Sequence, residues 1–92
     1  MFNAEVIVAM KPSACGIEER LIEIIEKNGG NVEKNNEWQK KKIGTPIGEV
    51  EADYFQLIIK TDKATMKEID EELKALRFED KVINHLLLSR RN

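Results

Sequence analysis

The clearest indication of the fold comes from residues 37–47, which read EWQKKKIGTPI. This segment joins a run of three lysines to the single Trp of the chain, and Pro46 stands near its end. Proline has no backbone N–H to donate to a neighbouring strand, and rows of lysine are tolerated where a strand faces water. The pattern therefore predicts a strand at the edge of a sheet.

The composition limits the kind of protein this chain can be. It has 92 residues, of which 41% are hydrophobic and 35% are charged, with a formal net charge of −2. A chain of this length has room for one modest core, so we expect a single domain over residues 1–92 with a short polar tail at residues 89–92. A weakly acidic chain does not hold nucleic acid by its overall charge, so any such contact must come from a local basic patch.

Location is indicated by two features of the sequence. The longest apolar run at the N-terminus, Val6–Met10, is too short to span a bilayer and lacks the basic flank of a signal peptide. The single cysteine, Cys15, cannot form an internal disulfide and is expected to be a free thiol in a reducing compartment. We therefore expect a cytoplasmic chain without a membrane partner, with the interior of an organelle as the alternative.

Upstream of the lysine run, the pattern predicts a strand, a helix and then the edge strand itself. Residues 5–10 form a compact apolar run, which suits a strand in the middle of a sheet. Apolar residues recur at helical spacing over residues 17–28, and Gly29-Gly30 ends this helix. Residues 31–47 are predicted to be the second strand.

Downstream of the lysine run, the predicted order is strand, helix, strand. Residues 48–53 are expected to be a loop or hairpin connection, and residues 54–60 the third strand. The sequence of residues 65–68, Thr-Met-Lys-Glu, matches a capping box, which predicts that a second helix begins there and ends near Arg77. Residues 82–88 are predicted to be the fourth strand.

The resulting order of elements indicates the fold class. Strand, helix, strand, strand, helix, strand is typical of the α+β ferredoxin-like split βαβ sandwich (βαββαβ), a four-stranded antiparallel sheet with two helices on one face. The third strand is apolar at Phe55, Leu57 and Ile59 and mixed at alternate positions, which predicts one covered face and one partly open face. Enzymes, ligand sensors and RNA-binding modules share this architecture, so the fold alone does not determine the function.

The sequence contains few of the residues from which catalytic or metal sites are usually built. A metal site needs several converging His, Cys or carboxylate ligands, and the chain has one His and one Cys. His85 lies within the fourth predicted strand, where we favour a partly buried structural histidine over a general base. Cys15 stands near the first turn of a helix, where we favour a small packed residue over a reactive thiol. We expect no enzymatic activity, no cofactor and no small-molecule substrate.

The lysine run leaves two interpretations open. Lys40, Lys41 and Lys42 beside Trp38 could contact RNA phosphates, or they could form a solvated edge that discourages pairing with another strand. Further basic residues lie before the fourth predicted strand, at Arg77, and after it. The residue pattern does not distinguish between these interpretations.

Several short motifs occur in a definite order along the chain. They are Lys11-Pro12 after the first strand, Gly29-Gly30 after the first helix, the acidic, aromatic and basic residues with a Pro-Ile exit in residues 37–47, Tyr54 at the start of the third strand, and Leu76-Arg77-Phe78 before the fourth. Over nearly the whole chain this order resembles the bacterial-type small-subunit ribosomal protein six family.

The resemblance implies a structural constituent of the small ribosomal subunit without catalytic activity, bound to ribosomes in the cytoplasm or in an organelle. It implies binding to the central domain of the small-subunit ribosomal RNA together with small-subunit ribosomal protein eighteen. Contacts to phosphates would position the protein without reading base sequence. Carried over position by position, the RNA-binding residues are Lys41, Lys42, Tyr54 and Arg77, to which charge and neighbourhood add Lys40 and Arg90.

The alternative hypothesis is a stand-alone ferredoxin-like protein-interaction or ligand-sensing module. It rests on the apolar residues on both sides of the third and fourth strands, through which such a module could form oligomers. A stable homo-oligomer without RNA affinity would support this alternative.

Overall fold

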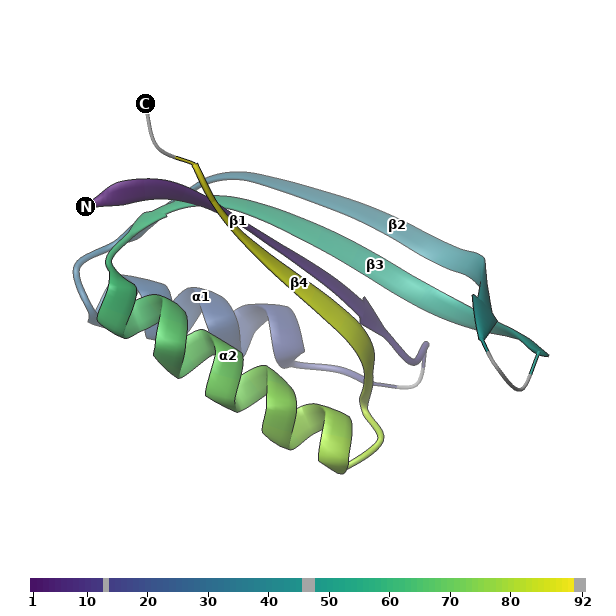
Figure 1. The fold of residues 1–92 in the computed structure, drawn as a ribbon. Coiled ribbons are helices and arrows are strands. Elements are labelled where there is room, and N and C mark those ends of the chain that lie inside the picture. The colour runs from purple at the N-terminus through teal and green to yellow at the C-terminus, as the bar shows by residue number, and fades with distance from the viewer. Residues whose placement is uncertain (13, 46–47, 91–92) are drawn as a thin grey trace.

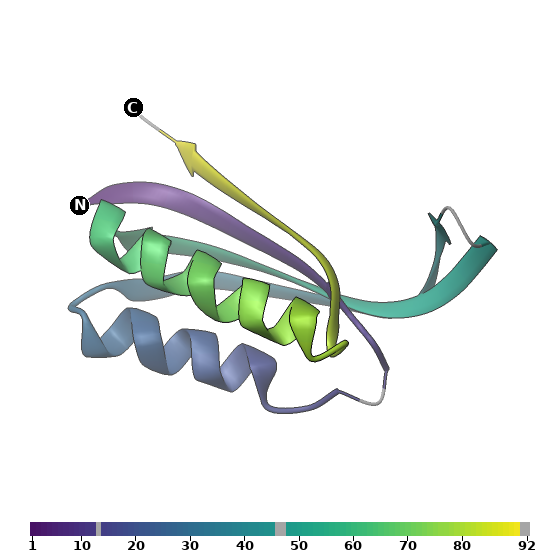
Figure 2. The ribbon, with the colours of Figure 1, turned by 60° about the horizontal axis from the view of Figure 1, so that its bottom comes forward.

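A computed structural model describes residues 1–12, 14–45 and 48–90 and shows the expected architecture (Figure 1). The strands form one antiparallel sheet in the order β2-β3-β1-β4, and both helices lie on the same face of it (Figure 2). The predicted ferredoxin-like fold class is confirmed. The elements are β1 (Phe2–Met10), α1 (Ile17–Lys27), β2 (Asn31–Thr45), β3 (Gly48–Thr61), α2 (Lys63–Phe78) and β4 (Val82–Arg90).

The hydrophobic core lies between the sheet and the two helices. Side chains alternate between the two faces of a strand, so every second residue of the central strands β1 and β3 faces the helices. Apolar residues at helical spacing on α1 and α2 face the sheet in return. The fully buried core residues include Val6 and Val8 of β1, Phe55, Leu57 and Ile59 of β3, Leu21 and Ile25 of α1, and Ile69 and Leu73 of α2.

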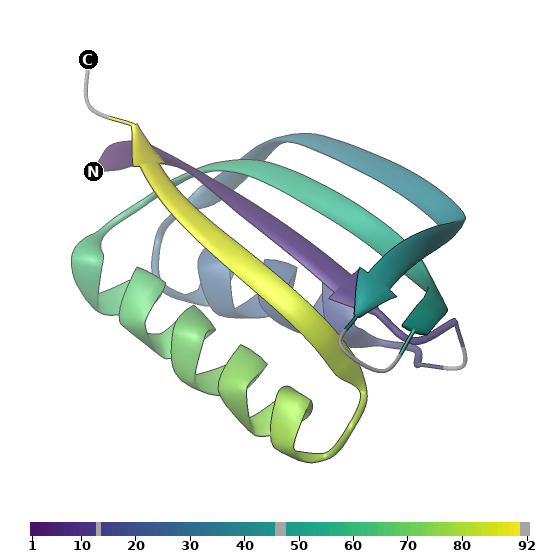
Figure 3. The same ribbon diagram turned by 45° about the vertical axis from the view of Figure 1, so that its right-hand side comes forward.

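β3 begins earlier than the sequence indicated. Residues 48–53, which we expected to be a loop or hairpin connection, are the first part of this strand and belong to a hairpin with β2. Residues 48–52 pair with residues 41–45 of β2, and because β1 ends opposite Asp53 these two segments leave the sheet as a two-stranded ribbon (Figure 3). We call residues 41–45 and 48–52 the ribbon. Where β1 has ended, residues 48–52 lie outside the main hydrophobic cluster, although Ala52 is buried. These residues therefore lack the regular apolar alternation from which a strand is predicted.

α2 also begins earlier than predicted. The prediction of a capping box at residues 65–68 is therefore wrong. The N-cap residue is Asp62, whose Oδ1 accepts a hydrogen bond from the Thr65 backbone N–H at 2.8 Å. Hydrogen bonds from Thr65 hold the pKa of Asp62 below its ordinary value. Thr65 has the residue type of an N-cap, but in this helix its backbone amide is the group that is capped.

β4 is longer than predicted. Ser89 and Arg90, which we placed in the polar tail, continue the strand and pair with Ala4 and Asn3 of β1. The rest of that tail, residues 91–92, and the Pro46-Ile47 exit lie outside the described residues. Among the described residues, no helix is long and apolar enough to cross a membrane.

Candidate functional site

β2 is an edge strand, as its lysine run predicted. A β-bulge precedes the ribbon, because Trp38 pairs with Tyr54 and Lys41 pairs with Ala52, which leaves two residues of β2 opposite Asp53 alone. Bulges bend a strand and increase its twist. Figure 3 shows β2 changing direction as it enters the ribbon. The backbones of Lys40, Lys41 and Lys42 therefore lie where the edge strand turns away from the body of the sheet.

Opposite charges are separated between the two strands of the hairpin. Lys42 is exposed and lies opposite the exposed Glu51. The three lysines are all on β2, whereas the acidic residues nearest to them in the hairpin, Glu49, Glu51 and Asp53, are all on β3. The basic and acidic residues of the ribbon and the bulge before it therefore belong to different strands of the hairpin. This arrangement suits a contact with one row of phosphates and agrees with the weakly acidic net charge.

Trp38 and Tyr54 form a cross-strand pair at the base of the ribbon. Tyr54 alternates with the buried Phe55, so this pair lies on the face of the sheet away from the helices. Trp38 is 41% exposed, and Tyr54 is half-buried. The structure thus places the predicted Tyr54 next to the lysines of β2.

The two predicted arginines lie at opposite ends of the molecule. Arg77 is in the last turn of α2, which lies at the same end as the ribbon (Figure 1). Arg90 pairs with Asn3, whereas the ribbon begins beyond Met10. At about 3.4 Å per residue, Asn3 and Met10 are roughly 24 Å apart along β1. Arg77 therefore lies toward the ribbon end but in the helix layer beside β4, whereas the lysines and Tyr54 are on β2 and β3, and Arg90 is at the other end of the sheet.

The face of the sheet away from the helices changes character from one edge to the other. Leu86 and Leu88 of β4 are 51% and 41% exposed there. Gln56 Nε2 donates to Glu5 Oε2 at 3.4 Å, and Asn36 Nδ2 donates to Gln56 Oε1 at 3.1 Å. These five residues define what we call the open face. Its β4 margin is apolar, and a row of polar side chains crosses from β1 to β2.

His85 lies on the helix-covered face of β4. Its side chain is 7% exposed, and its Nε2 is 3.0 Å from Asp70 Oδ1 on α2. Lys74 Nζ lies 2.8 Å from Asp70 Oδ2, and Lys74 and His85 together hold the pKa of Asp70 below its ordinary value. The predicted burial of His85 is confirmed, and its side chain is more deeply buried than we expected. Its acidic partner was missed, because sequence spacing does not show which residue of α2 lies over His85.

A contact between two carboxyl groups joins α1 to β2. Burial and a hydrogen bond with the neighbouring Glu37 carboxyl raise the pKa of Glu18. The Asn35 side-chain amide donates a hydrogen bond to Glu18. This contact was not predicted from the sequence, because glutamate is usually found at positions that face solvent.

Two other features offer no chemistry to the candidate site. Cys15 is exposed, so our prediction of a packed residue is wrong; it precedes Gly16, the N-cap residue of α1, and therefore lies outside the helix. Among the described residues, no group of three His, Cys, Asp or Glu side chains could hold a metal ion.

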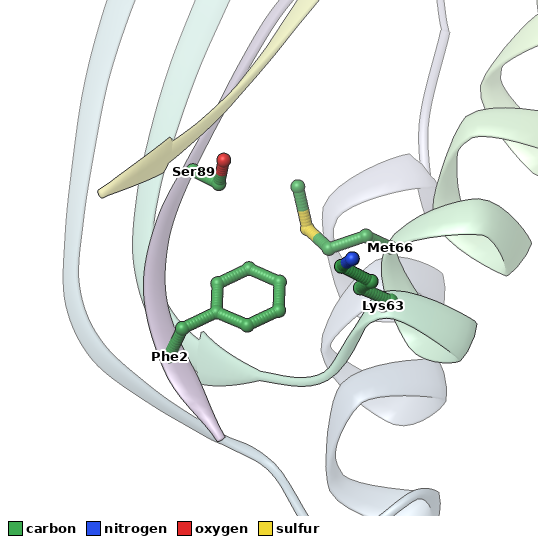
Figure 4. A pocket seen from close by; sticks show the side chains of 4 residues that line it. All are labelled: Phe2, Lys63, Met66 and Ser89. Carbon is green, nitrogen blue, oxygen red and sulfur yellow. The ribbon is translucent and has the colours of Figure 1, made fainter. Parts of the chain in front are cut away.

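A shallow cavity lies at the end of the molecule opposite the ribbon (Figure 4). Phe2 of β1 and Met66 of α2 face each other across it, with Lys63 and Ser89 at its margin. Its volume is about 190 Å³. Pockets for small molecules usually measure about 300–1,000 Å³, so the size of this cavity does not support a substrate site.

A ferredoxin-like sheet with a lysine-bearing edge, a cross-strand pair of the exposed Trp38 and the half-buried Tyr54, and an open face suits an RNA-binding scaffold protein. The family of ribosomal protein S6 matches residues 5–89, and the chain belongs to this family. It is therefore a ribosomal protein of the small subunit, bound within a ribonucleoprotein particle, in a family of structural proteins and not of enzymes. The resemblance inferred from the short motifs is confirmed.

Two solved structures are similar to this chain. A crystal structure of 30S ribosomal protein S6 from Thermotoga maritima matches with a TM-score of 0.72 and 20% identity, covering 97% of this chain and 87% of that chain. A crystal structure of an unknown protein from Galdieria sulphuraria matches with a TM-score of 0.65 and 18% identity, covering 98% of this chain and 50% of that chain. At these identities the likeness shows the fold.

Proposed function

We propose that this chain binds the central domain of the small-subunit ribosomal RNA together with small-subunit ribosomal protein eighteen, as a scaffold without catalytic activity. The observation that carries the proposal is the contrast between the lysine-bearing β2 edge and the apolar β4 margin of the open face. Membership of the S6 family supports it. We place the protein on cytoplasmic ribosomes, with the ribosomes of an organelle as the alternative.

The RNA contact is assigned to the ribbon end of the molecule. Lys40, Lys41 and Lys42 follow the outer strand of the hairpin, and Tyr54 and Arg77 lie at the same end. Lysines on a projecting edge can approach phosphates away from the acidic helix α1. The affinity of such contacts falls with salt, because bound phosphates release their counterions.

Arg90 is assigned to a separate contact. Its backbone position beside Asn3 is too far from the ribbon for both to meet one phosphate. In the proposed complex it meets a different stretch of the same RNA, and its loss should weaken binding independently of the ribbon lysines.

The partner contact is assigned to the β4 margin of the open face. Leu86 and Leu88 keep about half of their surface in water, whereas the core residues of the neighbouring β1 are buried. Covering an exposed apolar margin is favourable in rough proportion to the area removed from water. Polar neighbours such as Glu5 and Gln56 would form hydrogen bonds that fix the orientation of the partner.

The proposal is tested by measuring the affinity of this chain and protein eighteen for a central-domain RNA fragment. The change is Lys41→Ala with Lys42→Ala, and the control is Lys63→Ala with Lys67→Ala, which removes the same charge from α2. We expect the ribbon variant to bind roughly tenfold more weakly and the slope of log affinity against log salt to fall by about 1–2. Equal losses in both variants would reject a specific contact at the ribbon.

A second candidate function is a homo-oligomeric interaction module. The exposure of Leu86 and Leu88 favours it, because a second copy of the chain could cover the same margin. Light scattering separates the candidates: a stable oligomer without affinity for ribosomal RNA supports the module, and a monomer that binds RNA supports the ribosomal scaffold.

A further inference from the structure

Phe78, the last residue of α2, has little contact with the rest of the chain. It is 94% exposed, more than any other large hydrophobic residue that the structure describes. Single exposed apolar residues are common on protein surfaces. An aromatic ring left almost wholly in water contributes little to the core, however, and its apolar area remains available to a partner.

The backbone turn that follows Phe78 is fixed by hydrogen bonds and by an ion pair. Asp80 N–H donates to the Arg77 carbonyl at 3.0 Å, in a Schellman-type ending where Asp80 takes a φ of +64°. Lys11 N–H donates to the Lys81 carbonyl at 3.0 Å, and the Lys11 side chain forms an ion pair with Asp80. The turn that follows Phe78 is therefore tied both to its own helix and to the end of β1.

The charges around Phe78 leave a positive excess. Asp80 is paired with Lys11, and Glu79 Oε2 lies 3.5 Å from Lys81 Nζ. Arg77, next to the ring in sequence, makes no ion pair with any residue that the structure describes. A cation in the last turn is favoured by the helix dipole, and its guanidinium remains available to an external anion.

We infer that Phe78 is a stacking platform for an unpaired base of the bound RNA, with Arg77 contacting the phosphate beside that base. This inference rests on the proposed function. Every base has an apolar face, and proteins bind unpaired nucleotides by combining aromatic rings with basic side chains. The last turn of α2 lies at the ribbon end of the molecule, so one RNA segment can meet both (Figure 2).

A protein partner suits this position less well. Protein interfaces are built around clusters of apolar residues that are buried together. Trp38, Leu86 and Leu88 are exposed on strands, Met1 precedes β1, and none of these residues belongs to α2 with Phe78. A lone ring among charged side chains matches a base better than it matches a hydrophobic protein surface.

The test is the affinity of the complex with protein eighteen for the central-domain RNA fragment in three variants. Phe78→Ala should weaken binding roughly 5- to 150-fold, the range expected for one stacked base. Phe78→Leu keeps an apolar side chain without a ring and should lose most of the same affinity. Phe78→Trp should retain it. The thermal midpoint should stay within a degree or two in all three variants, because the exposed ring adds little to the core.

Each outcome of these measurements separates the inference from the proposed function. If Phe78→Ala binds RNA like the wild type while Lys41→Ala with Lys42→Ala binds more weakly, the stacking platform is rejected and the RNA scaffold stands. Full affinity in Phe78→Leu would reject stacking in favour of a simple apolar contact. If the wild type itself does not bind the RNA, both proposals fail.

Discussion

The two edge strands of the sheet, β2 and β4, differ in the side chains that they expose to water. An edge strand has unpaired backbone groups that invite another strand, and proteins usually protect it with lysines, bulges or a cover. β2 has both the lysines and two shifts of register, whereas β4 exposes Leu86 and Leu88 on the open face. β2 therefore has the features of an edge strand that stays in water, whereas β4 presents an apolar margin on the open face, which is why we propose RNA for the first and a protein partner for the second.

The largest expected effect comes from making the β4 edge resemble the β2 edge. Leu86→Lys with Leu88→Lys should weaken binding to protein eighteen at least about 100-fold, because it places charge in the apolar centre of the contact. Folding should change little, since both leucines are half-exposed. Isothermal titration calorimetry of the two proteins without RNA measures this.

The matched control for that variant is Ala64→Lys with Ala75→Lys, which adds the same charge to exposed positions of α2. The control should bind the partner as the wild type does. A similar loss in the control would mean that net charge, and not the β4 margin, determines the affinity.

The next effect tests how β2 joins the sheet despite its polar sequence. A Cβ at Gly30 would lie 2.4 Å from the Lys60 carbonyl oxygen and 3.0 Å from Ile25 Cγ2. Gly30→Ala should therefore lower the free energy of unfolding by about 2–3 kcal/mol, because backbone and core atoms must move. Gly16→Ala is the control, since nothing lies within 4 Å of its Cβ and only its positive φ is strained. Urea denaturation should rank the two; an equal cost would contradict the close contact.

A smaller effect tests the contact that joins β4 to α2, between His85 and Asp70. Asp70→Asn removes the charge that faces His85 and should destabilise the protein by about 1 kcal/mol near neutral pH. The lowered pKa of Asp70 means that its stabilising contribution is present above its ordinary value of 3.8 and is lost as the pH falls through its folded value. The wild type should therefore lose more stability than Asp70→Asn between pH 4 and pH 2, as measured by chemical denaturation. Parallel pH profiles would exclude this anchor.

The smallest effect concerns the β2 side. The raised pKa of Glu18 means that protonation of this carboxyl stabilises the folded state, and that this contribution is lost as the pH rises through its folded value, above 4.5. Glu37→Gln removes the neighbouring charge and should stabilise the protein at pH 7 by a few tenths of a kcal/mol, because a largely exposed pair is screened by water. It should also flatten the stability profile between pH 4.5 and pH 7. A loss of stability at pH 7 would show that Glu37 has another role.

The sequence predicted the elements that face the core. Burial on one face of an element spaces its apolar residues with the period of that element. This holds for the apolar run of β1, the helical spacing of α1 and the alternation around Leu57 in β3. The β3 half of the ribbon was missed because residues 48–52 lie outside the main hydrophobic cluster, although Ala52 is buried. The start of α2 was predicted wrongly because Asp and Thr are both common N-cap residues, so the sequence did not distinguish Asp62 from Thr65.

The candidate site was predictable only in part. The edge position of the lysines followed from their residue type and from Pro46. The separation of Arg90 from Arg77 depends on the register between β1 and β4, which a single sequence does not contain. The pairing of His85 with Asp70 depends on how α2 crosses β4, and the exposure of Phe78 depends on how α2 ends.

The assignment of different partners to the two edges is tested most directly by crossing two variants with two binding partners. The variants are Lys41→Ala with Lys42→Ala and Leu86→Lys with Leu88→Lys, and each is titrated with protein eighteen alone and then, at saturating partner, with the central-domain RNA fragment. We predict that the lysine variant keeps its affinity for protein eighteen and loses RNA affinity, whereas the leucine variant loses protein eighteen. If each variant lost both affinities to the same extent, the two edges would not have separate roles.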